Sequence, residues 1–276
     1  MSPTSIAALG AIAGVTIFIG LPVGRLRNAA PRTRALLNAA ATGILVFLVW
    51  DVLSHAWEPV DAALSAHEIG AAGGYGAVLA VAFTVGIMGL VYLDRWIARR
   101  ARHPVPVGPG ASVETAAGAL APAAVRARRL AMMIAVGIGL HNFAEGLAIG
   151  SSAASGALQL AVLLMIGFAL HNATEGFGIV APLAVEGYRP SWGYLGVLGL
   201  IGGGPTFLGT LVGQRFVSDV ASVAFLALAA GSILYVVVEL LAVARRIGFK
   251  ELTTWGLVLG VLLGFATDAI VTAAGA

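Results

Sequence analysis

The chain has 276 residues, of which 59% are hydrophobic and only 11% are charged, and it contains 37 glycines and no cysteine. About a quarter of the residues in an ordinary soluble domain are charged, so this composition excludes a disordered chain, a nucleic-acid-binding protein and almost any water-soluble fold. The absence of cysteine excludes disulfides, thiolate zinc sites, iron–sulfur clusters and a cysteine nucleophile. The net charge of +3 does not indicate an acidic partner, because the basic residues are placed as topology signals.

Long apolar runs predict transmembrane helices, since a hydrocarbon core of ~30 Å requires about 20 apolar residues of helix. Such runs lie at about residues 5–24, 36–57, 72–94, 129–150, 157–182, 191–213, 219–243 and 252–274. We expect the first run to be a true span and not a signal peptide, because Arg25 and Arg27 follow it instead of preceding it. The sequence therefore predicts an all-α polytopic membrane protein, with eight transmembrane helices in one domain over residues 1–276.

The basic residues predict the orientation of these helices. Lys and Arg accumulate in cytoplasmic loops, and of the 16 basic residues only Arg215 lies in an even-numbered loop. Odd-numbered loops are therefore expected to be cytoplasmic, with both termini outside, in a bacterial cytoplasmic (inner) membrane. The third loop, about residues 97–127, contains four prolines among small residues. It is predicted to be a flexible cytoplasmic linker that divides the helices into three plus five.

Ionisable residues inside the spans are the functional candidates, because each costs ~2.5 kcal/mol or more at membrane depth. They are Asp51, His55, His141, Glu145, His171, Glu175, Glu239 and Asp268. Asp51 and His55 are i, i+4 partners near the outer end of the second span, where a relay at the pathway entrance or a hydrogen-bonded helix end would each explain them. Glu239 lies nearer the cytoplasmic side, which suits an exit role. Asp268 has no evident partner in the sequence.

Four of these residues belong to two copies of one motif. Residues 137–146 read GIGLHNFAEG, and residues 167–176 read GFALHNATEG. The His and Glu of each copy are four residues apart, so both project from one helical face. Because consecutive spans run antiparallel, the two faces can oppose one another. Together they would offer two imidazoles, two carboxylates and two amide oxygens.

These donors favour a divalent transition metal. Imidazole suits Zn²⁺, Fe²⁺, Co²⁺, Ni²⁺ or Cu²⁺, and carboxylate and amide oxygens also admit Mn²⁺. Two histidines argue against a Ca²⁺ or Mg²⁺ site, which would be built from oxygen alone. A single intramembrane His or Asn often serves only as a hydrogen bond between helices. Two copies on adjacent spans, in a chain with five histidines, indicate metal binding instead.

The paired His-Asn-x-x-Glu-Gly motifs resemble those of the ZIP (Zrt-, Irt-like protein) family of divalent metal transporters, and the predicted topology is similar along the whole chain. The resemblance implies a single transporter domain and transport of Zn²⁺, with Fe²⁺, Mn²⁺, Co²⁺, Ni²⁺ and Cd²⁺ as alternatives, toward the cytoplasm. The metal is then the substrate, and no cofactor is expected. The implied ligands are His141, Asn142, Glu145, His171, Asn172 and Glu175. Glu239 resembles a family position near the transport path.

Two departures from the family pattern affect the expected site. The family usually has proline before each motif Glu, where this chain has Ala144 and Thr174, so the helices are expected to be straighter. Many members have a Glu-Pro on the sixth span that helps to hold a second metal. Here the corresponding residues are Gly204 and Pro205, which favours one principal site.

Two other functions would use the same donors. A membrane metalloenzyme is disfavoured, because no His-Glu-x-x-His motif is present and five histidines are too few for a di-iron hydroxylase. A metal sensor would keep the site without moving ions. The chain has no nucleotide-binding loop, so transport must be driven by the metal gradient, voltage or a coupled ion. The expected partners are divalent metal ions, the lipid bilayer and, in a homodimer, a second copy, with no nucleic acid.

Overall fold

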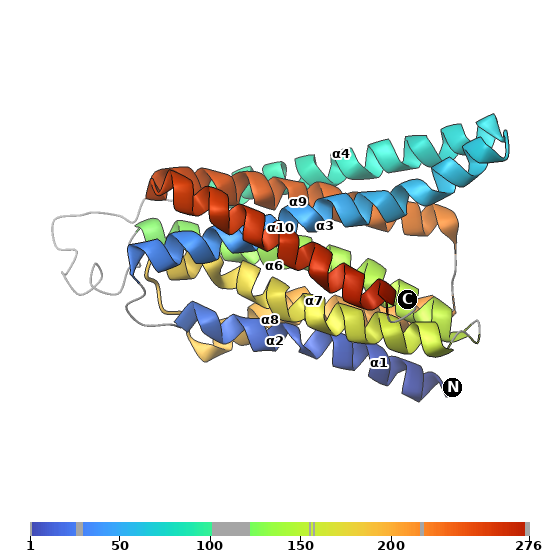
Figure 1. Ribbon diagram of the computed structural model, residues 1–276, viewed down its shortest axis with the longest axis horizontal. Helices are drawn as coiled ribbons and strands as arrows, with labels where there is room; N and C mark the ends of the chain where they lie inside the picture. The colour runs from blue at the N-terminus through green and yellow to red at the C-terminus, as the bar shows by residue number, and fades with distance from the viewer. Residues whose placement is uncertain are drawn as a thin grey trace.

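The computed structural model describes residues 2–25, 30–100, 122–154, 156, 158–215 and 218–273. A few helix residues, His171 among them, are described without their side chains. The described part of the chain consists of helices joined by short connections, without strands (Figure 1). The helices are α1 (Pro3–Val15), α2 (Ile17–Gly20), the 3₁₀ helix η1 (Leu21–Arg25), α3 (Pro31–Ser65), α4 (Ile69–Arg100), α6 (Pro122–Ala154), α7 (Leu158–Val185), α8 (Trp192–Gly213), α9 (Asp219–Ile247) and α10 (Lys250–Ala273).

Eight segments of the described chain are long and apolar enough to cross a membrane, which confirms the predicted all-α class and number of spans. The first of them, Pro3–Arg25, is interrupted at Thr16 between α1 and α2. The second is longer than the predicted span at 36–57, because α3 continues as helix to Ser65 and includes the acidic residues Glu58 and Asp61. Most of the predicted linker, residues 101–121, lies outside the described residues.

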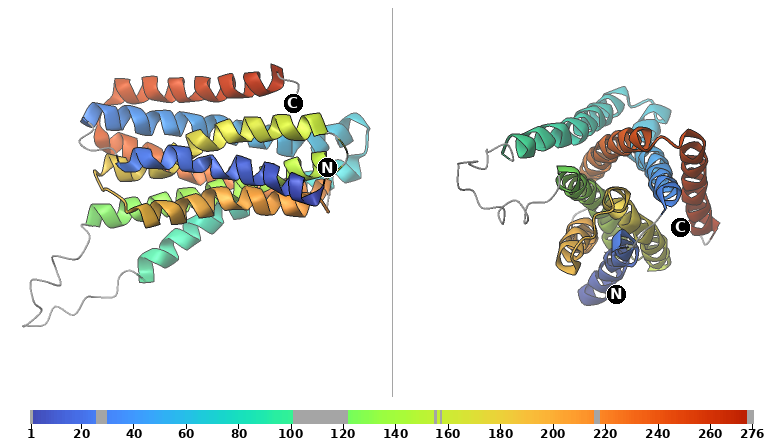
Figure 2. Two further views of the ribbon diagram at one scale, coloured as in Figure 1. Left: turned by 90° about the horizontal axis from the view of Figure 1, so that it is seen from below. Right: turned by 90° about the vertical axis from the view of Figure 1, so that its left-hand side faces the viewer.

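The spans form two groups that meet along one interface (Figure 2). In the first group, α6 packs against α7 and α8, and α1 and α2 pack against α7 and α8. In the second group, α3 packs against α9 and α10, and α4 packs against α9. We call them the motif group and the α3 group. The predicted three-plus-five division concerns chain order only, since the first span packs with the helices that follow the linker.

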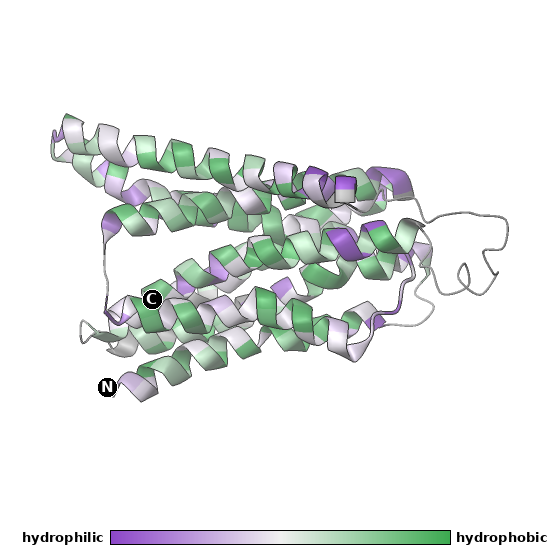
Figure 3. Ribbon diagram, turned by 180° about the vertical axis from the view of Figure 1, so that it is seen from behind, coloured by the Kyte–Doolittle hydropathy of each residue, from purple (hydrophilic) through white to green (hydrophobic). Residues whose placement is uncertain are grey.

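Both chain ends lie at one end of the bundle, opposite the end of α4 and the start of α6 (Figure 1). Strongly hydrophilic residues concentrate toward the ends of the helices, most of all beside α4 and α6 at the second end (Figure 3). This second end carries Arg95, Arg99, Arg126 and Arg246, so we call it the arginine end and the other the terminal end.

Glycines allow the helices of the motif group to approach closely, as small residues do in membrane proteins. A Cβ atom added at Gly146 of α6 would lie 2.1 Å from the carbonyl oxygen of Thr206 in α8. One added at Gly209 of α8 would lie 2.1 Å from the carbonyl oxygen of Phe143 in α6. This backbone contact joins α6 to α8 at the level of the sequence motif.

Candidate metal site

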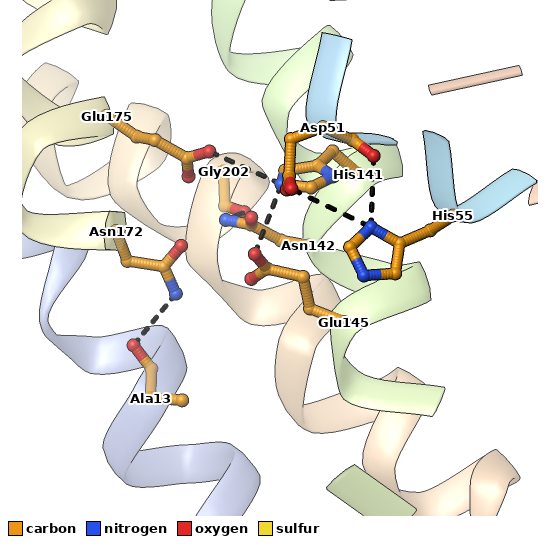
Figure 4. Close-up of polar contacts among 9 residues, drawn as sticks. All are labelled: Ala13, Asp51, His55, His141, Asn142, Glu145, Asn172, Glu175 and Gly202. Atoms are coloured by element: carbon orange, nitrogen blue, oxygen red, sulfur yellow. Dashed lines mark hydrogen bonds and ion pairs between the residues drawn. The ribbon is translucent and has the colours of Figure 1, made fainter. Parts of the chain in front are cut away.

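The two sequence motifs meet inside the bundle, as their spacing predicts. His141 and Glu145 lie one turn apart on α6, and Glu175 approaches them from α7 (Figure 4). The Nε2 atom of His141 is 3.1 Å from Glu145 Oε1 and 3.8 Å from Glu175 Oε1. All three residues are buried, with at most 4% of their surface exposed. One imidazole therefore lies between two carboxylates at membrane depth.

The two motif asparagines are fixed by backbone carbonyl groups. Asn142 Nδ2 donates to the carbonyl oxygen of Gly202 in α8, and Asn172 Nδ2 donates to that of Ala13 in α1, each at 2.9 Å (Figure 4). Because only the amide nitrogen can donate to a carbonyl, these bonds determine which way each amide is turned. The Oδ1 atoms have no hydrogen-bond partner among the described residues, so both amide oxygens remain free to act as acceptors.

Several carboxylate oxygens at this point are buried without hydrogen bonds. Among the described residues, Glu145 Oε2 and both oxygens of Glu175 lack a hydrogen-bond partner. A buried charge without partners is unfavourable unless a counter-charge or a metal compensates it. Among the described residues, no three His, Cys, Asp or Glu side chains lie close enough together to hold a metal ion in this conformation. The backbone of His171 lies in α7 one turn before Glu175, and its side chain is outside the described part.

A cavity of about 370 Å³ reaches this site from the terminal end. Its lining includes His141 and Glu145, together with Asp51 and His55 from α3 and Asp268 from α10. His55 Nδ1 is 2.9 Å from the carbonyl oxygen of Asp51 and 3.7 Å from its Oδ1. The pair therefore makes a local helix contact and also lines the cavity. Asp268, which has no evident partner in the sequence, lines the same cavity as Asp51 because α10 packs on α3.

Glu239 lies apart from the motifs, in a second cavity of about 160 Å³ at the arginine end. Charged residues from α4, α6, α9 and the turn after α7 line it: Asp94, Arg126, Arg129, Glu186, Glu239 and Arg246. Between the two cavities the helices present Ile134, Ile138, Ile179 and Ile233, which are buried in the central apolar cluster. We call these four residues the isoleucine layer. It lies between the site and the inner cavity, whereas the outer cavity reaches the site from the terminal end.

The departures from the expected motif have a simple structural result. Both α6 and α7 continue as helix through Ala144 and Thr174. The glycine that follows each motif Glu is a point of backbone contact. A Cβ added at Gly176 would lie 2.0 Å from the carbonyl oxygen of Ile17 in α2, as Gly146 meets α8. Gly204 in α8 supplies no carboxylate to the site.

A helical bundle with eight candidate spans and buried polar donors at its centre defines an integral membrane protein with a polar intramembrane site. The sequence profile of the family described as ZIP zinc transporter matches residues 100–272, more than half of the chain. The chain therefore belongs to the ZIP family, whose members transport divalent metal ions and are not enzymes. Comparison with curated proteins gives no match.

Proposed function

We propose that this transporter carries divalent transition-metal ions, Zn²⁺ first among them, toward the cytoplasm. The proposed ligands are His141, Asn142, Glu145, His171, Asn172 and Glu175. One observation carries the proposal: carboxylate oxygens of Glu145 and Glu175 are buried without hydrogen bonds beside His141, at the inner end of a cavity of about 370 Å³. A cation entering this cavity would supply the missing counter-charge.

The donor chemistry supports a divalent ion of the Zn²⁺ type. Two carboxylates balance two positive charges, and the imidazole nitrogen adds a ligand that Zn²⁺ and its neighbours accept more readily than Mg²⁺ or Ca²⁺. Two amide oxygens, from Asn142 and Asn172, complete a mixed nitrogen and oxygen set. With Gly204 in place of a further carboxylate, we propose one principal site and not a two-metal centre.

The proposed route begins at the terminal end and leads toward the arginine end. Asp51, His55 and Asp268 line the outer cavity and would attract the ion before it reaches His141. Beyond the isoleucine layer, Glu239 lines the inner cavity, which fits its proposed exit role. Basic residues favour the cytoplasmic side, so we propose that the arginine end faces the cytoplasm of a bacterium and that transport is inward.

The closed isoleucine layer implies that ions cross by a change of conformation. The motif group carries all of the proposed ligands, and the α3 group lines the other side of both cavities. Many transporters alternate access by moving one helix group against another around a fixed site. We propose that the motif group moves against the α3 group and that the present structure has its site open to the outside. Exposed apolar side chains such as Val81 of α4 and Leu262 of α10 would face lipid.

Competition for uptake would identify the substrate. Proteoliposomes that contain the wild-type protein should take up ⁶⁵Zn²⁺ in a saturable manner, and excess external Cd²⁺, Co²⁺, Fe²⁺, Ni²⁺ or Mn²⁺ should inhibit to the extent that each binds the site. Mg²⁺ and Ca²⁺ should not inhibit, since an imidazole-containing site suits them poorly. Inhibition by Ca²⁺ as strong as that by Cd²⁺ would contradict a histidine-containing site.

Replacing Asn142 with alanine should reduce Zn²⁺ uptake by about 10-fold or more, within the range seen when groups that orient metal ligands are removed. Asn38→Ala provides a matched control. Asn38 is also buried and also donates to a backbone carbonyl, that of Leu240 at 3.3 Å, but it lies on α3, outside the two motifs. Uptake rates normalised to reconstituted protein test this prediction. Equal losses in both variants would mean that the Asn142 effect is structural.

A further inference from the structure

We propose that Arg129 of α6 and Asp94 of α4 form a latch that holds the cytoplasmic route closed and must open before metal leaves. The inference rests on the proposed function, because it assigns a role in the transport cycle to residues far from the metal donors. Arg129 forms an ion pair with the Asp94 carboxylate and also donates to the Asp94 main-chain carbonyl. Both side chains are partly buried, 23% and 33% exposed.

The latch links α6 to α4, in addition to the packing of α6 on α9 that also joins the two groups. Arg129 belongs to the motif group and Asp94 to the α3 group, and α4 and α6 share no extensive packing between their described residues. Arg129 is also coupled to the rest of its own group through its neighbour. Arg128 donates to the Tyr188 hydroxyl at 2.8 Å and accepts from the Tyr194 hydroxyl at 2.7 Å through its main-chain oxygen. Movement of the motif group would therefore carry Arg129 away from Asp94.

The charges around the inner cavity are divided between the groups in a way that suits this role. Asp94, Glu239 and Arg246 come from the α3 group, whereas Arg126, Arg129 and Glu186 come from the motif group. With the latch closed, the Arg129 guanidinium lies where a departing cation would pass, and like charges repel strongly in a partly buried setting. When the groups separate, Arg129 leaves Asp94 and Glu239 together on one wall, where their carboxylates can receive the ion.

The isoleucine layer excludes water but cannot by itself fix the position of one group against the other. Apolar contacts are non-directional, so they tolerate sliding. An ion pair combined with a main-chain hydrogen bond defines one register between α4 and α6. The latch therefore stabilises the closed register, and the layer makes that register impermeable.

The absence of native cysteine allows a direct test with one introduced thiol. Ile134→Cys places it in the isoleucine layer, and its labelling by a membrane-impermeant maleimide is followed from the arginine-end side in oriented vesicles without metal. Adding Asp94→Asn should raise the labelling rate about fivefold, the change that a partly exposed ion pair supports. In a separate variant with Ala148→Cys in the outer cavity, labelling from the opposite side should fall when Asp94→Asn is added.

Two further variants separate the latch from a general loss of structure. Charge reversal, with Asp94→Arg and Arg129→Asp together, should return both labelling rates toward those of the parent protein. Asp61→Asn, which removes an exposed carboxylate at the other end of the bundle, should change neither rate. The latch is wrong if Asp94→Asn leaves both rates unchanged, if it raises both together, or if the reversed pair labels as fast as Asp94→Asn. Because no metal is present, these outcomes leave the proposed metal site to be judged by uptake alone.

Discussion

Replacing His141 and Glu175 together with alanine should reduce Zn²⁺ uptake into proteoliposomes to the level of empty vesicles. The change removes the imidazole that lies between the two buried carboxylates and one of those carboxylates. Removing a group that only orients a metal ligand typically lowers metal affinity by about 10–100-fold. Loss of two ligands should therefore lower uptake by at least about 100-fold. Initial rates of ⁶⁵Zn²⁺ entry per reconstituted chain provide the measurement.

A surface pair supplies the control for this double variant. His67 and Glu68 are exposed neighbours at the connection of α3 and α4, and His67→Ala with Glu68→Ala removes the same functional groups from the protein. Uptake should stay close to the wild-type rate in this control. Wild-type uptake by the His141 and Glu175 variant would remove these residues from the transport site.

Gly176→Ala should destabilise the protein strongly although it adds only one methyl group. The new Cβ would lie 2.0 Å from the carbonyl oxygen of Ile17, which belongs to the backbone of α2 and cannot rotate away. Overpacking of this kind typically destabilises by about 1–3 kcal/mol, so that loss or more is expected here. Because Gly176 follows Glu175, the displaced backbone should also impair uptake. Thermal unfolding in detergent and uptake at equal protein amounts would measure both effects.

Gly178→Ala is the matched control on the same helix. A Cβ added there meets no atom within 4 Å, and alanine is about 1 kcal/mol more favourable than glycine inside a helix. This variant should be at least as stable as the wild type. If the unfolding temperature of Gly176→Ala is no lower than that of Gly178→Ala, the close contact between α2 and α7 does not limit the side chain at position 176.

The fold could be predicted largely because membrane insertion imposes a simple rule on composition. Apolar runs of sufficient length indicated the eight spans that the described chain contains. The rule failed at α3, where residues up to Ser65 continue the helix. Acidic residues outside the hydrocarbon region can remain helical, so an increase in polarity marks the end of the apolar run and not the end of the helix. The grouping of spans depends on packing and could not be predicted from hydropathy.

The meeting of the two motifs could be predicted because the i, i+4 spacing of His and Glu fixes one face of each helix. Other parts of the site depend on contacts that leave no mark in the sequence. Asn142 and Asn172 are oriented by carbonyl groups of Gly202 and Ala13, and every residue has such a group. Asp268 reaches the outer cavity through the packing of α10 on α3. Arg129 was interpreted only as a topology signal, yet it pairs with Asp94, 35 residues earlier.

Paired measurement of Zn²⁺ binding and Zn²⁺ entry in one proteoliposome preparation tests the central claim, that ions cross the membrane through the site on α6 and α7. We predict about one tightly bound Zn²⁺ per chain, together with saturable entry that exceeds the number of chains many times over. Both should be lost in the His141 and Glu175 variant. Binding at this ratio with entry no faster than in empty vesicles would instead define a metal sensor, and it would contradict transport through this site.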